Sequence, residues 1–197
     1  MTKEQILKAT LDLAYEKGLG RISMSQIAEK VNLQKSSLYS HYRSKDELIE
    51  AMYLHFRDKA KRSSGNEHTD YGKLVEGKTL LEVLSFVVDP YRQIIHDPEM
   101  NKFWKVVEAE RTINKTAAAI TVEETNRMIT AVKYLFYALK AKGIGHFDDP
   151  DAAALSFAMG VHSLIVFECD AEMAGTHDAD GMMDRYIKEF CRVYDHG

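Results

Sequence analysis

Apolar side chains recur every three or four residues along most of this 197-residue chain, and this helical spacing limits most strongly how it can fold. No segment alternates apolar and polar residues over the length of a strand. No Asn-Gly or Asp-Gly pair joins two alternating runs. The sequence therefore predicts an all-α protein.

Four helices are expected in the first 62 residues. The first covers residues 3–17 and precedes Gly18, which suits a left-handed C-terminal cap. The second begins in the capping-box pattern Ser23-Met24-Ser25-Gln26 and ends at Asn32, a residue type that tolerates the positive φ of a tight turn. A short helix follows over about residues 34–40. Another capping box, Ser44-Lys45-Asp46-Glu47, opens a helix to about residue 62, whose inward residues are Leu48, Met52, His55 and Phe56.

The remainder of the chain is also predicted to be helical. Residues 63–78 are polar and contain three glycines, which indicates a boundary loop. Thr79-x-x-Glu82 starts the next helix, which Pro90 is expected to break or kink. Further helices are expected from Asp97-Pro98, from Thr121-x-x-Glu124 to near Lys142-Gly143, from Asp149-Pro150 through Phe167, and after a Gly175–Gly181 loop.

Composition excludes several classes of protein. The chain is 45% hydrophobic and 28% charged, which suits a folded soluble domain and not a disordered one. We find no apolar run of the roughly 18–20 residues that a membrane-spanning helix needs, and no secretory signal at the N-terminus. The two cysteines, Cys169 and Cys191, form no disulfide framework. We therefore expect a cytoplasmic protein with no membrane partner.

Charge is distributed unevenly along the chain. Residues 1–62 carry 12 Lys and Arg against 8 Asp and Glu, whereas the whole chain has a formal net charge of −4. A local basic surface attracts phosphates even when the whole protein is acidic. This excess permits nucleic-acid binding by the N-terminal segment, although a solvated charged surface would give the same count.

Residues 23–45 carry the strongest functional signal. Two short helices separated by Asn32-Leu33 have the proportions of a helix-turn-helix. In the second, Leu38 and Tyr42 lie on the inward side, and the other side carries small polar groups that can bind bases or phosphates. The residues expected to face DNA are Ser23, Ser25, Gln34, Lys35, Ser36, Ser37, Tyr39, Ser40, His41 and Lys45. The alternative interpretation is a solvated surface helix with ordinary caps.

The run IAEKVNLQKSSLYSHYRSKDELI resembles the DNA-binding signature of TetR-family transcriptional regulators. The matching residues are Ile27-Ala28, Leu38-Tyr39, His41-Tyr42 and Ser44-Lys45-Asp46-Glu47-Leu48, within a similarity that spans about residues 3–62. Two positions depart from the pattern, since Asn32 stands where the family usually has glycine and Ser36 where it often has a glycine or another small residue. Neither change threatens the fold, but Ser36 affects which base is read.

The resemblance implies three domains and a homodimer. The helix-turn-helix would occupy residues 1–45, a connecting helix 46–62, and an effector-binding and dimerisation domain 63–197. Two recognition helices about 34–36 Å apart would read a pseudo-palindromic operator in double-stranded DNA. Residues 150–168 and 180–194 are the implied dimer helices. The alternative is that the apolar residues of these helices belong to the core of the monomer. The same holds for the small residues that permit close helix approach, namely Ala153, Ala154, Ala158 and Gly160.

The resemblance also implies a small-molecule effector in the C-terminal domain, whereas no cofactor or metal is expected. Aromatic and methionine side chains suit an apolar or flat ligand, but at helical spacing they also suit a core. His162, conspicuous on an apolar segment, is equally compatible with a core role. Glu168 is a further polar candidate, and Cys169 with His177 or Glu168 is a loose metal pattern. The candidate ligand residues are Phe86, Phe103, Trp104, Glu108, Met128, Phe136 and His162.

An enzyme is not predicted, because the chain lacks GxSxG, HExxH, Walker-type and GxGxxG motifs. The expected function is that of a dimeric repressor, released from its operator by the effector. Two alternatives stay open. One is an architectural or cell-division DNA-binding protein of the same fold without effector control. The other is a helical enzyme that contains a segment like a helix-turn-helix.

Overall fold

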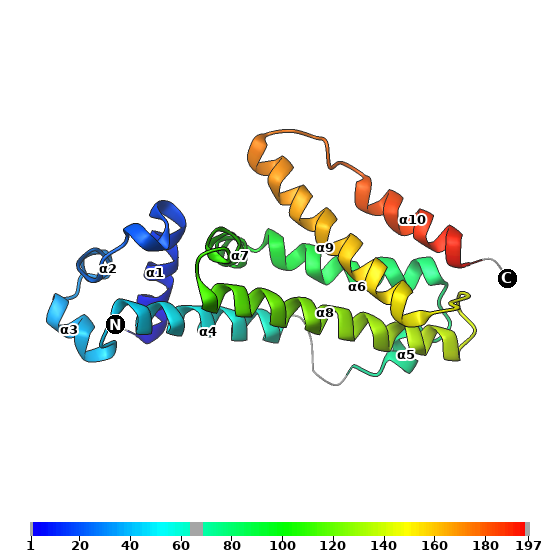
Figure 1. The fold of residues 1–197 in the computed structure, drawn as a ribbon, viewed down its shortest axis with the longest axis horizontal. Coiled ribbons are helices and arrows are strands. Elements are labelled where there is room, and N and C mark those ends of the chain that lie inside the picture. Colours follow the sequence, from blue (N-terminus) through cyan, green and yellow to red (C-terminus); the bar gives the residue numbers. More distant parts are fainter. Residues whose placement is uncertain (1, 64–68, 196–197) are drawn as a thin grey trace. The chain divides into compact units, whose positions relative to one another are not determined.

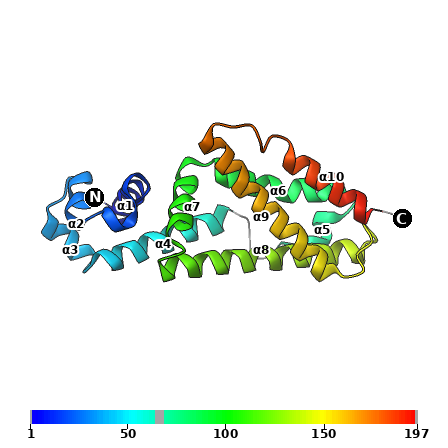
Figure 2. The same ribbon diagram turned by 45° about the horizontal axis from the view of Figure 1, so that its top comes forward.

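The computed structural model describes residues 2–63 and 69–195, which are helical with connecting turns (Figures 1 and 2). No strand occurs within those ranges, which confirms the all-α prediction. In chain order the elements are α1 Lys3–Lys17, η1 Leu19–Arg21, α2 Met24–Lys30, α3 Lys35–His41, α4 Lys45–Ser63, α5 Tyr71–Val75, α6 Leu80–His96, α7 Pro98–Glu110, α8 Lys115–Ala141, α9 Pro150–Ala174 and α10 Met182–Tyr194.

The chain forms two compact units that do not follow its linear order. Unit 1 comprises Met1–Gly65 and Ile94–Glu123, and unit 2 comprises Asn66–Gln93 and Glu124–Gly197. The first unit therefore contains α7 and the start of α8 together with α1–α4. The predicted division into residues 1–45, 46–62 and 63–197 describes functional segments, not compact units, and stays a prediction.

Side-chain caps begin the helices where the sequence predicts them. The Ser23 hydroxyl accepts the backbone N–H of Gln26, whose side chain in turn accepts the backbone N–H of Ser23. Asp97 accepts two backbone N–H groups of α7, and Asp149 accepts two of α9. Each cap satisfies N–H groups that have no partner inside the helix. These predicted starts are confirmed.

Of two other predicted capping boxes, the first forms as predicted and the second differs in detail. Thr79 and Glu82 exchange both hydrogen bonds, and the backbone N–H of Thr79 is the largest of the influences that lower the pKa of the Glu82 carboxyl. At the start of α4, Ser44 accepts the backbone N–H of Glu47, but the Glu47 carboxylate accepts the backbone N–H of Arg43 instead of that of Ser44. This bond ties the turn after α3 to the first turn of α4.

The start of α8 corrects one prediction. The Asn114 side chain accepts the backbone N–H groups of Thr116 and Ala117, so α8 begins at Lys115. Thr121 is an interior residue whose hydroxyl donates to the carbonyl of Ala117. The expected start at Thr121 is therefore wrong, because Asn114 caps the helix earlier.

The expected loop over residues 63–78 is also partly wrong. Within it, Asp70 accepts the backbone N–H of Lys73 and caps α5, which buries Val75. Residues 64–68 lie outside the described residues. A single cap and one buried apolar side chain are sufficient for a helix of this length once it packs on a larger core.

Two further helices are longer than expected. α6 continues through Pro90 to His96, so the predicted break is wrong. Proline removes one backbone hydrogen bond, but the apolar residues Leu80, Val83, Leu84 and Val88 stay buried along the helix. α9 continues past Phe167 to Ala174 and ends at Gly175, whose φ is 70°. Glycine adopts this left-handed conformation without a steric cost.

By length and composition α9 is long and apolar enough to cross a membrane, which corrects the expectation that no such run exists. One helix of this kind is weak evidence for a span, since core helices pass the same test. α9 buries Ala154, Phe157 and Val161, while Leu155 and Met159 are exposed. It packs alongside α10 (Figures 1 and 2). The helix therefore has apolar residues both on its buried face and on its exposed face.

Each unit has its own core. In unit 1, Phe103 of α7 lies between Phe56, with ring centroids 5.8 Å apart, and Trp104, at 5.1 Å. The cluster also includes Leu38, so the core extends to α3. In unit 2, Phe136 packs against Phe147, Phe157 and Phe190.

The inward face of α4 differs from the prediction at one position. Leu48, Met52 and Phe56 are buried as expected. His55, however, is half-buried, and Tyr53 is buried instead.

Candidate functional site

The turn between α2 and α3 has the tight geometry of a helix-turn-helix. Asn32 adopts φ 53°, as predicted from its tolerance of left-handed conformations. The backbone N–H of Leu33 donates to the carbonyl of Ala28 at 2.8 Å, which closes the end of α2.

Gly18, after α1, also has positive φ, but its ψ of 146° is not that of a left-handed helical cap. That expectation is therefore wrong in detail.

The recognition-type helix α3 is anchored on one side and open on the other. Leu38 is 0% exposed and Tyr42 is 6% exposed, so these two residues hold α3 against the core. Tyr39 is 43% exposed, and Ser37 is half-buried with its carbonyl accepting the Ser40 hydroxyl. The remaining predicted DNA-facing residues of this segment are exposed, namely Gln34, Lys35, Ser36, Ser40 and His41.

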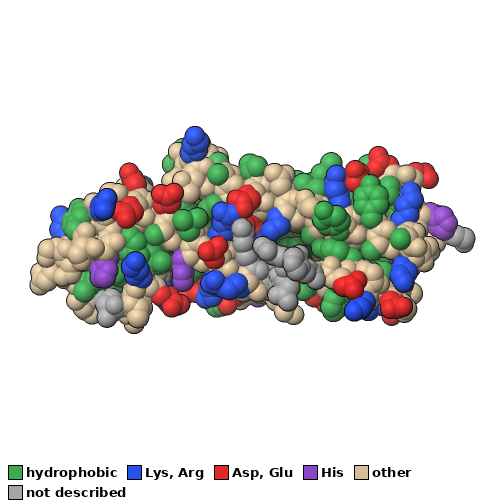
Figure 3. Space-filling model, turned by 90° about the horizontal axis from the view of Figure 1, so that it is seen from below, with side chains coloured by type: hydrophobic (Ala, Val, Ile, Leu, Met, Phe, Trp, Pro, Cys, Tyr) green, Lys and Arg blue, Asp and Glu red, His purple; other side chains and the backbone are tan. Residues whose placement is uncertain are grey.

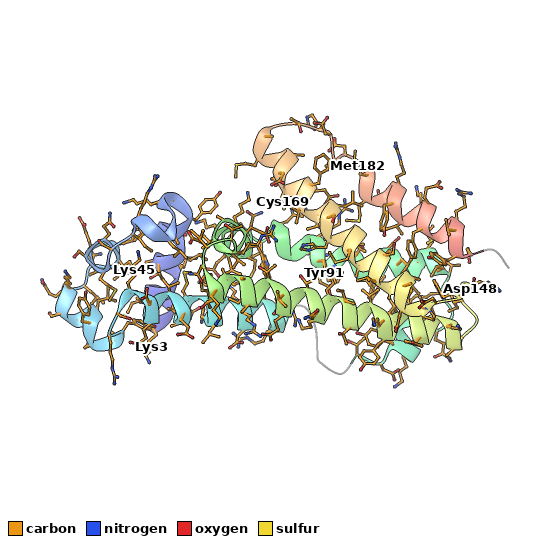
Figure 4. All side chains as sticks on the ribbon, viewed as in Figure 1. Lys3, Lys45, Tyr91, Asp148, Cys169 and Met182 are labelled. Atoms are coloured by element: carbon orange, nitrogen blue, oxygen red, sulfur yellow. The ribbon has the colours of Figure 1, made fainter. Side chains whose placement is uncertain are left out.

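The groups at the helix starts play unequal roles. The Ser23 hydroxyl already accepts a backbone N–H in its cap, whereas Ser25 in the first turn of α2 is exposed. Lys45 is the first residue of α4 and lies next to α3 (Figure 4). Ser25 and Lys45 therefore lie in the first turns of α2 and α4, and the backbone N–H groups at helix starts favour anions.

Several basic side chains of unit 1 form ion pairs. Lys8 and Lys59 pair with Glu99, Lys30 pairs with Glu16, and Arg57 pairs with Glu123. Among the described residues, Lys35, Arg43 and Lys45 have no such carboxylate partner. On the face shown in Figure 3, basic and acidic side chains both lie toward the left end. Lys35, Arg43 and Lys45 therefore place positive charge on α3 and the turn after it, next to the acidic Asp46 and Glu47 in the first turn of α4.

Arg43 is a residue that the sequence interpretation missed. It is exposed, lies two residues after the end of α3, and donates its backbone N–H to the Glu47 carboxylate. The available signal was its position between two predicted DNA-facing residues, His41 and Lys45. The Nζ of Lys35 lies 6.0 Å from the centroid of the Tyr39 ring, a distance at the limit of a cation–π contact.

The predicted effector residues are divided between the two units. Phe103, Trp104 and Glu108 belong to unit 1, and Phe86, Met128, Phe136 and His162 belong to unit 2. Phe103 and Phe136 are fully buried core residues, whereas Phe86 is 56% exposed. Trp104, Met128 and His162 are half-buried. Glu108 pairs with Arg111 at 2.9 Å.

A polar cluster in unit 2 was not predicted. Arg127 Nη2 lies 2.6 Å from Glu124 Oε2. Both residues belong to α8, at the point where the part of this helix that lies in unit 2 begins. Burial raises the pKa of the Tyr91 hydroxyl on α6, and the positive charge of Arg127 opposes this effect (Figure 4). The ring of Tyr71 stacks near that of Tyr134, with centroids 6.3 Å apart. The i, i+3 spacing of Glu124 and Arg127 was the only sequence signal.

A second polar group joins three helices of unit 2. Arg92 of α6 lies 2.9 Å from Glu168 of α9 and 3.7 Å from Asp184 of α10. Glu168, a polar candidate in the sequence, is thus in an ion pair. His177 pairs with Asp180 at 3.3 Å, and no group of three metal-ligating side chains occurs in the part of the chain that is described.

Comparisons with known proteins agree with this architecture. Residues 6–52 match the family model for bacterial regulatory proteins of the tetR family, and residues 82–196 match the C-terminal domain of AefR-like transcriptional repressors. The chain therefore belongs to the TetR family of transcriptional regulators, with a DNA-binding helix-turn-helix at its N-terminus.

Several solved structures share the fold at low sequence identity. A putative transcriptional regulator from Saccharomonospora viridis, in complex with choline, has a TM-score of 0.71 and 15% identity, covering 96% of this chain and 95% of that one. A putative TetR-family regulator from Mesorhizobium loti has a TM-score of 0.69 and 20% identity, covering 98% and 96%. A SmeT–triclosan complex has a TM-score of 0.67 and 15% identity, covering 98% and 91%.

Proposed function

We propose that this protein is a ligand-responsive repressor that binds a palindromic DNA operator as a homodimer in the cytoplasm. The observation that carries the proposal is the outward face of α3, which is polar, lacks acidic residues and is held in place by buried Leu38. A short helix of this kind fits the major groove without burying apolar surface in it.

In this proposal the contacts divide between bases and phosphates. Gln34, Lys35, Ser37, Tyr39 and His41 contact the major groove and its backbone. Ser25, Tyr39 and Lys45 bind phosphates, which fix the register of the helix on the duplex. Ser23, Ser36 and Ser40 border this surface.

The proposed dimer forms through α9 and α10, over residues 150–168 and 180–194. In the single chain Leu155, Met159 and Phe167 on α9 are exposed, as are Met182 and Val193 on α10. Exposed apolar side chains on two packed helices are typical of the core of an interface. A two-fold axis would bring two copies of α3 to successive turns of the duplex.

The proposed effector binds in unit 2. Similar proteins have been solved with choline or triclosan, although their identity to this chain is low. In unit 2 the charged pair Glu124–Arg127 acts on the hydroxyl of Tyr91, and α6 and α8, which carry these residues, also bury apolar side chains such as Leu84 and Val132. Mostly apolar surroundings with a few polar groups are typical of small-molecule sites.

Effector binding would release DNA by tilting α4, which begins directly after α3. The effector can shift this equilibrium only through a difference in its affinity for the two states. A coupling of about 1–3 kcal/mol is typical of allostery.

Selection of bound duplexes from random DNA, followed by a screen for compounds that release the selected duplex, tests the proposal. We expect a palindromic consensus and at least one releasing compound. A non-palindromic or unselective outcome would overturn the DNA assignment. A palindrome that no compound releases would favour the architectural alternative.

A further inference from the structure

Glu99 of α7 contacts both α1 and α4, the two helices that flank the helix-turn-helix pair α2 and α3. It lies in the first turn of α7, where its backbone N–H donates to Asp97 at 3.0 Å. One oxygen of its carboxylate accepts Lys8 Nζ of α1 at 2.9 Å, and the other accepts Lys59 Nζ of α4. A single carboxylate thus joins α1 to α4.

The surroundings of Glu99 strengthen this contact. The Glu99 side chain is only 20% exposed, so solvent screens its ion pairs less than those of a surface carboxylate. Burial acts to raise the pKa of Glu99, but the hydrogen bonds from Lys59 and Lys8 lower it overall. The same bond raises the pKa of Lys8. Both shifts show that the charged pair is favoured in the folded protein.

Other polar contacts fasten α7 along α1. Lys102 of α7 lies 2.5 Å from Asp12 of α1. The backbone N–H of Leu19, just after α1, donates to the Glu110 carboxylate at 3.3 Å. Glu99 differs from these groups because it alone among them also reaches α4.

The angle between α1 and α4 matters for DNA binding. α1 packs against α2, α4 and α7, and α4 begins four residues after α3 ends. The recognition helix is therefore held between elements that α1 and α4 position. A change in their relative orientation would turn α3 even if α3 itself remained intact.

We infer that Glu99 is a positioning residue for DNA binding, which joins α1 to α4 and thereby holds α3 in one orientation. The inference rests on the proposed function. A dimer binds a palindrome tightly only when both recognition helices fit their half-sites at once. If α3 is loosely oriented in each subunit, binding to the full palindrome is therefore weakened. Binding of one subunit to a single half-site is much less sensitive to the orientation of α3, because that subunit can adjust its position on the DNA independently.

The test compares Glu99→Gln with the control Asp70→Asn, which breaks an exposed i, i+3 ion pair with Lys73 and keeps an oxygen to cap α5. Affinities are measured for the selected palindrome and for a duplex with one half-site. For Glu99→Gln we expect about tenfold weaker binding to the palindrome and at most about twofold weaker binding to the half-site. The salt dependence should be unchanged, because no phosphate-binding cation is removed. Asp70→Asn should behave as the wild type.

Amide hydrogen exchange gives a readout that does not involve DNA. Glu99→Gln should speed exchange in α1 without changing exchange in α9 and α10, because only the α1–α4 contact is loosened. In Lys8→Met, which leaves Lys59 as a partner of Glu99, both effects should be smaller. Lys8→Met also serves if Glu99→Gln fails to fold.

The inference is overturned if Glu99→Gln binds the palindrome as tightly as the wild type. It is also overturned if both duplexes lose affinity equally, since Glu99 would then act only through overall stability. A wild-type protein that selects no palindrome overturns the proposed function and removes the basis of this inference. Wild-type selection with an unaffected variant overturns the inference alone.

Discussion

Gly160 illustrates how one residue sets the distance between two helices. A Cβ atom there would overlap the hydroxyl and ring of Tyr186, which packs across it from α10. The Tyr186 hydroxyl also donates to the carbonyl of Ser156 at 3.0 Å. The sequence suggested that Gly160 permits close helix approach, and in the structure the approaching group belongs to the same chain.

Gly160→Ala should therefore destabilise the protein by about 1–3 kcal/mol, measured by denaturant unfolding. The loss should appear even though alanine favours a helix over glycine by about 0.5–1 kcal/mol. Gly20→Ala is the control, because nothing lies within 4 Å of its Cβ position and its φ is not positive. A more stable Gly160→Ala variant would contradict the packing argument.

Cys191 should be unreactive in the folded protein. Burial raises the pKa of its thiol to about 11, so at pH 8 only about a thousandth is thiolate. In a Cys169→Ala background, we expect iodoacetamide to modify Cys191 only after denaturation, as followed by mass spectrometry. Equal labelling rates in native and denatured protein would disprove this.

Lys45→Ala should weaken binding to every DNA sequence and lower the salt slope by about one phosphate contact. Arg43→Ala should do the same, since this exposed residue lies on the same surface. Affinity measured at several salt concentrations decides the matter. Unchanged slopes would remove both residues from the phosphate-binding set.

At the scale of elements, side-chain caps explain where helices begin. Asp97 and Asp149 followed by proline were recognisable in the sequence, and both cap helices. Asn114 was not recognised, since its two N–H contacts at Thr116 and Ala117 form only when α8 starts there. Short polar side chains are frequent in loops, so a cap is clear from sequence only when a second signal such as proline follows it.

The pairing of α7 with α1 and α4 should be sensitive to acid. The pKa of Glu99 is lower in the folded protein than its ordinary value of 4.5, so the unfolded chain binds a proton more readily. Stability from this group is present above about pH 4.5 and lost as the pH falls through the folded pKa. The protection of α1 amides, corrected for the pH dependence of intrinsic exchange, should therefore fall in acid, and Glu99→Gln should flatten this dependence. An identical pH profile in the variant would exclude Glu99 as the cause.

At the scale of the whole molecule, the proposed dimer would cover the exposed apolar side chains of α9 and α10. Leu155 is 47% exposed in the single chain, although the neighbouring Ala154 is 0% exposed. One helix thus serves a core on one side and an open face on the other. The expected closed two-fold dimer would cover this second face.

Leu155→Glu should convert the dimer to a folded monomer, because it places a charge in the apolar interface. Sedimentation gives the oligomeric state, and circular dichroism confirms the helices. Val122→Glu is the control, at a position 61% exposed on α8. Operator binding should be lost in the first variant and kept in the second. A dimer that survives Leu155→Glu would place the interface elsewhere.

The sequence by itself determined the features that depend on neighbouring residues. Helical spacing, the caps at Ser23 and Asp97, the turn at Asn32 and the inward Leu38 are all local, so the pattern of the chain was sufficient to predict them. The family signature around α3 lies within the same short range. These signals identified both the fold class and the DNA-binding helix.

Only the tertiary structure decided which distant segments share a core. It placed α7 with α1 and α4, joined Lys8 to Glu99, and packed Tyr186 over Gly160. It also showed that Phe103 and Phe136, predicted as effector contacts, fill two separate cores. An aromatic residue at helical spacing has the same pattern in either role. The choice depends on side chains far along the chain that meet it only after folding.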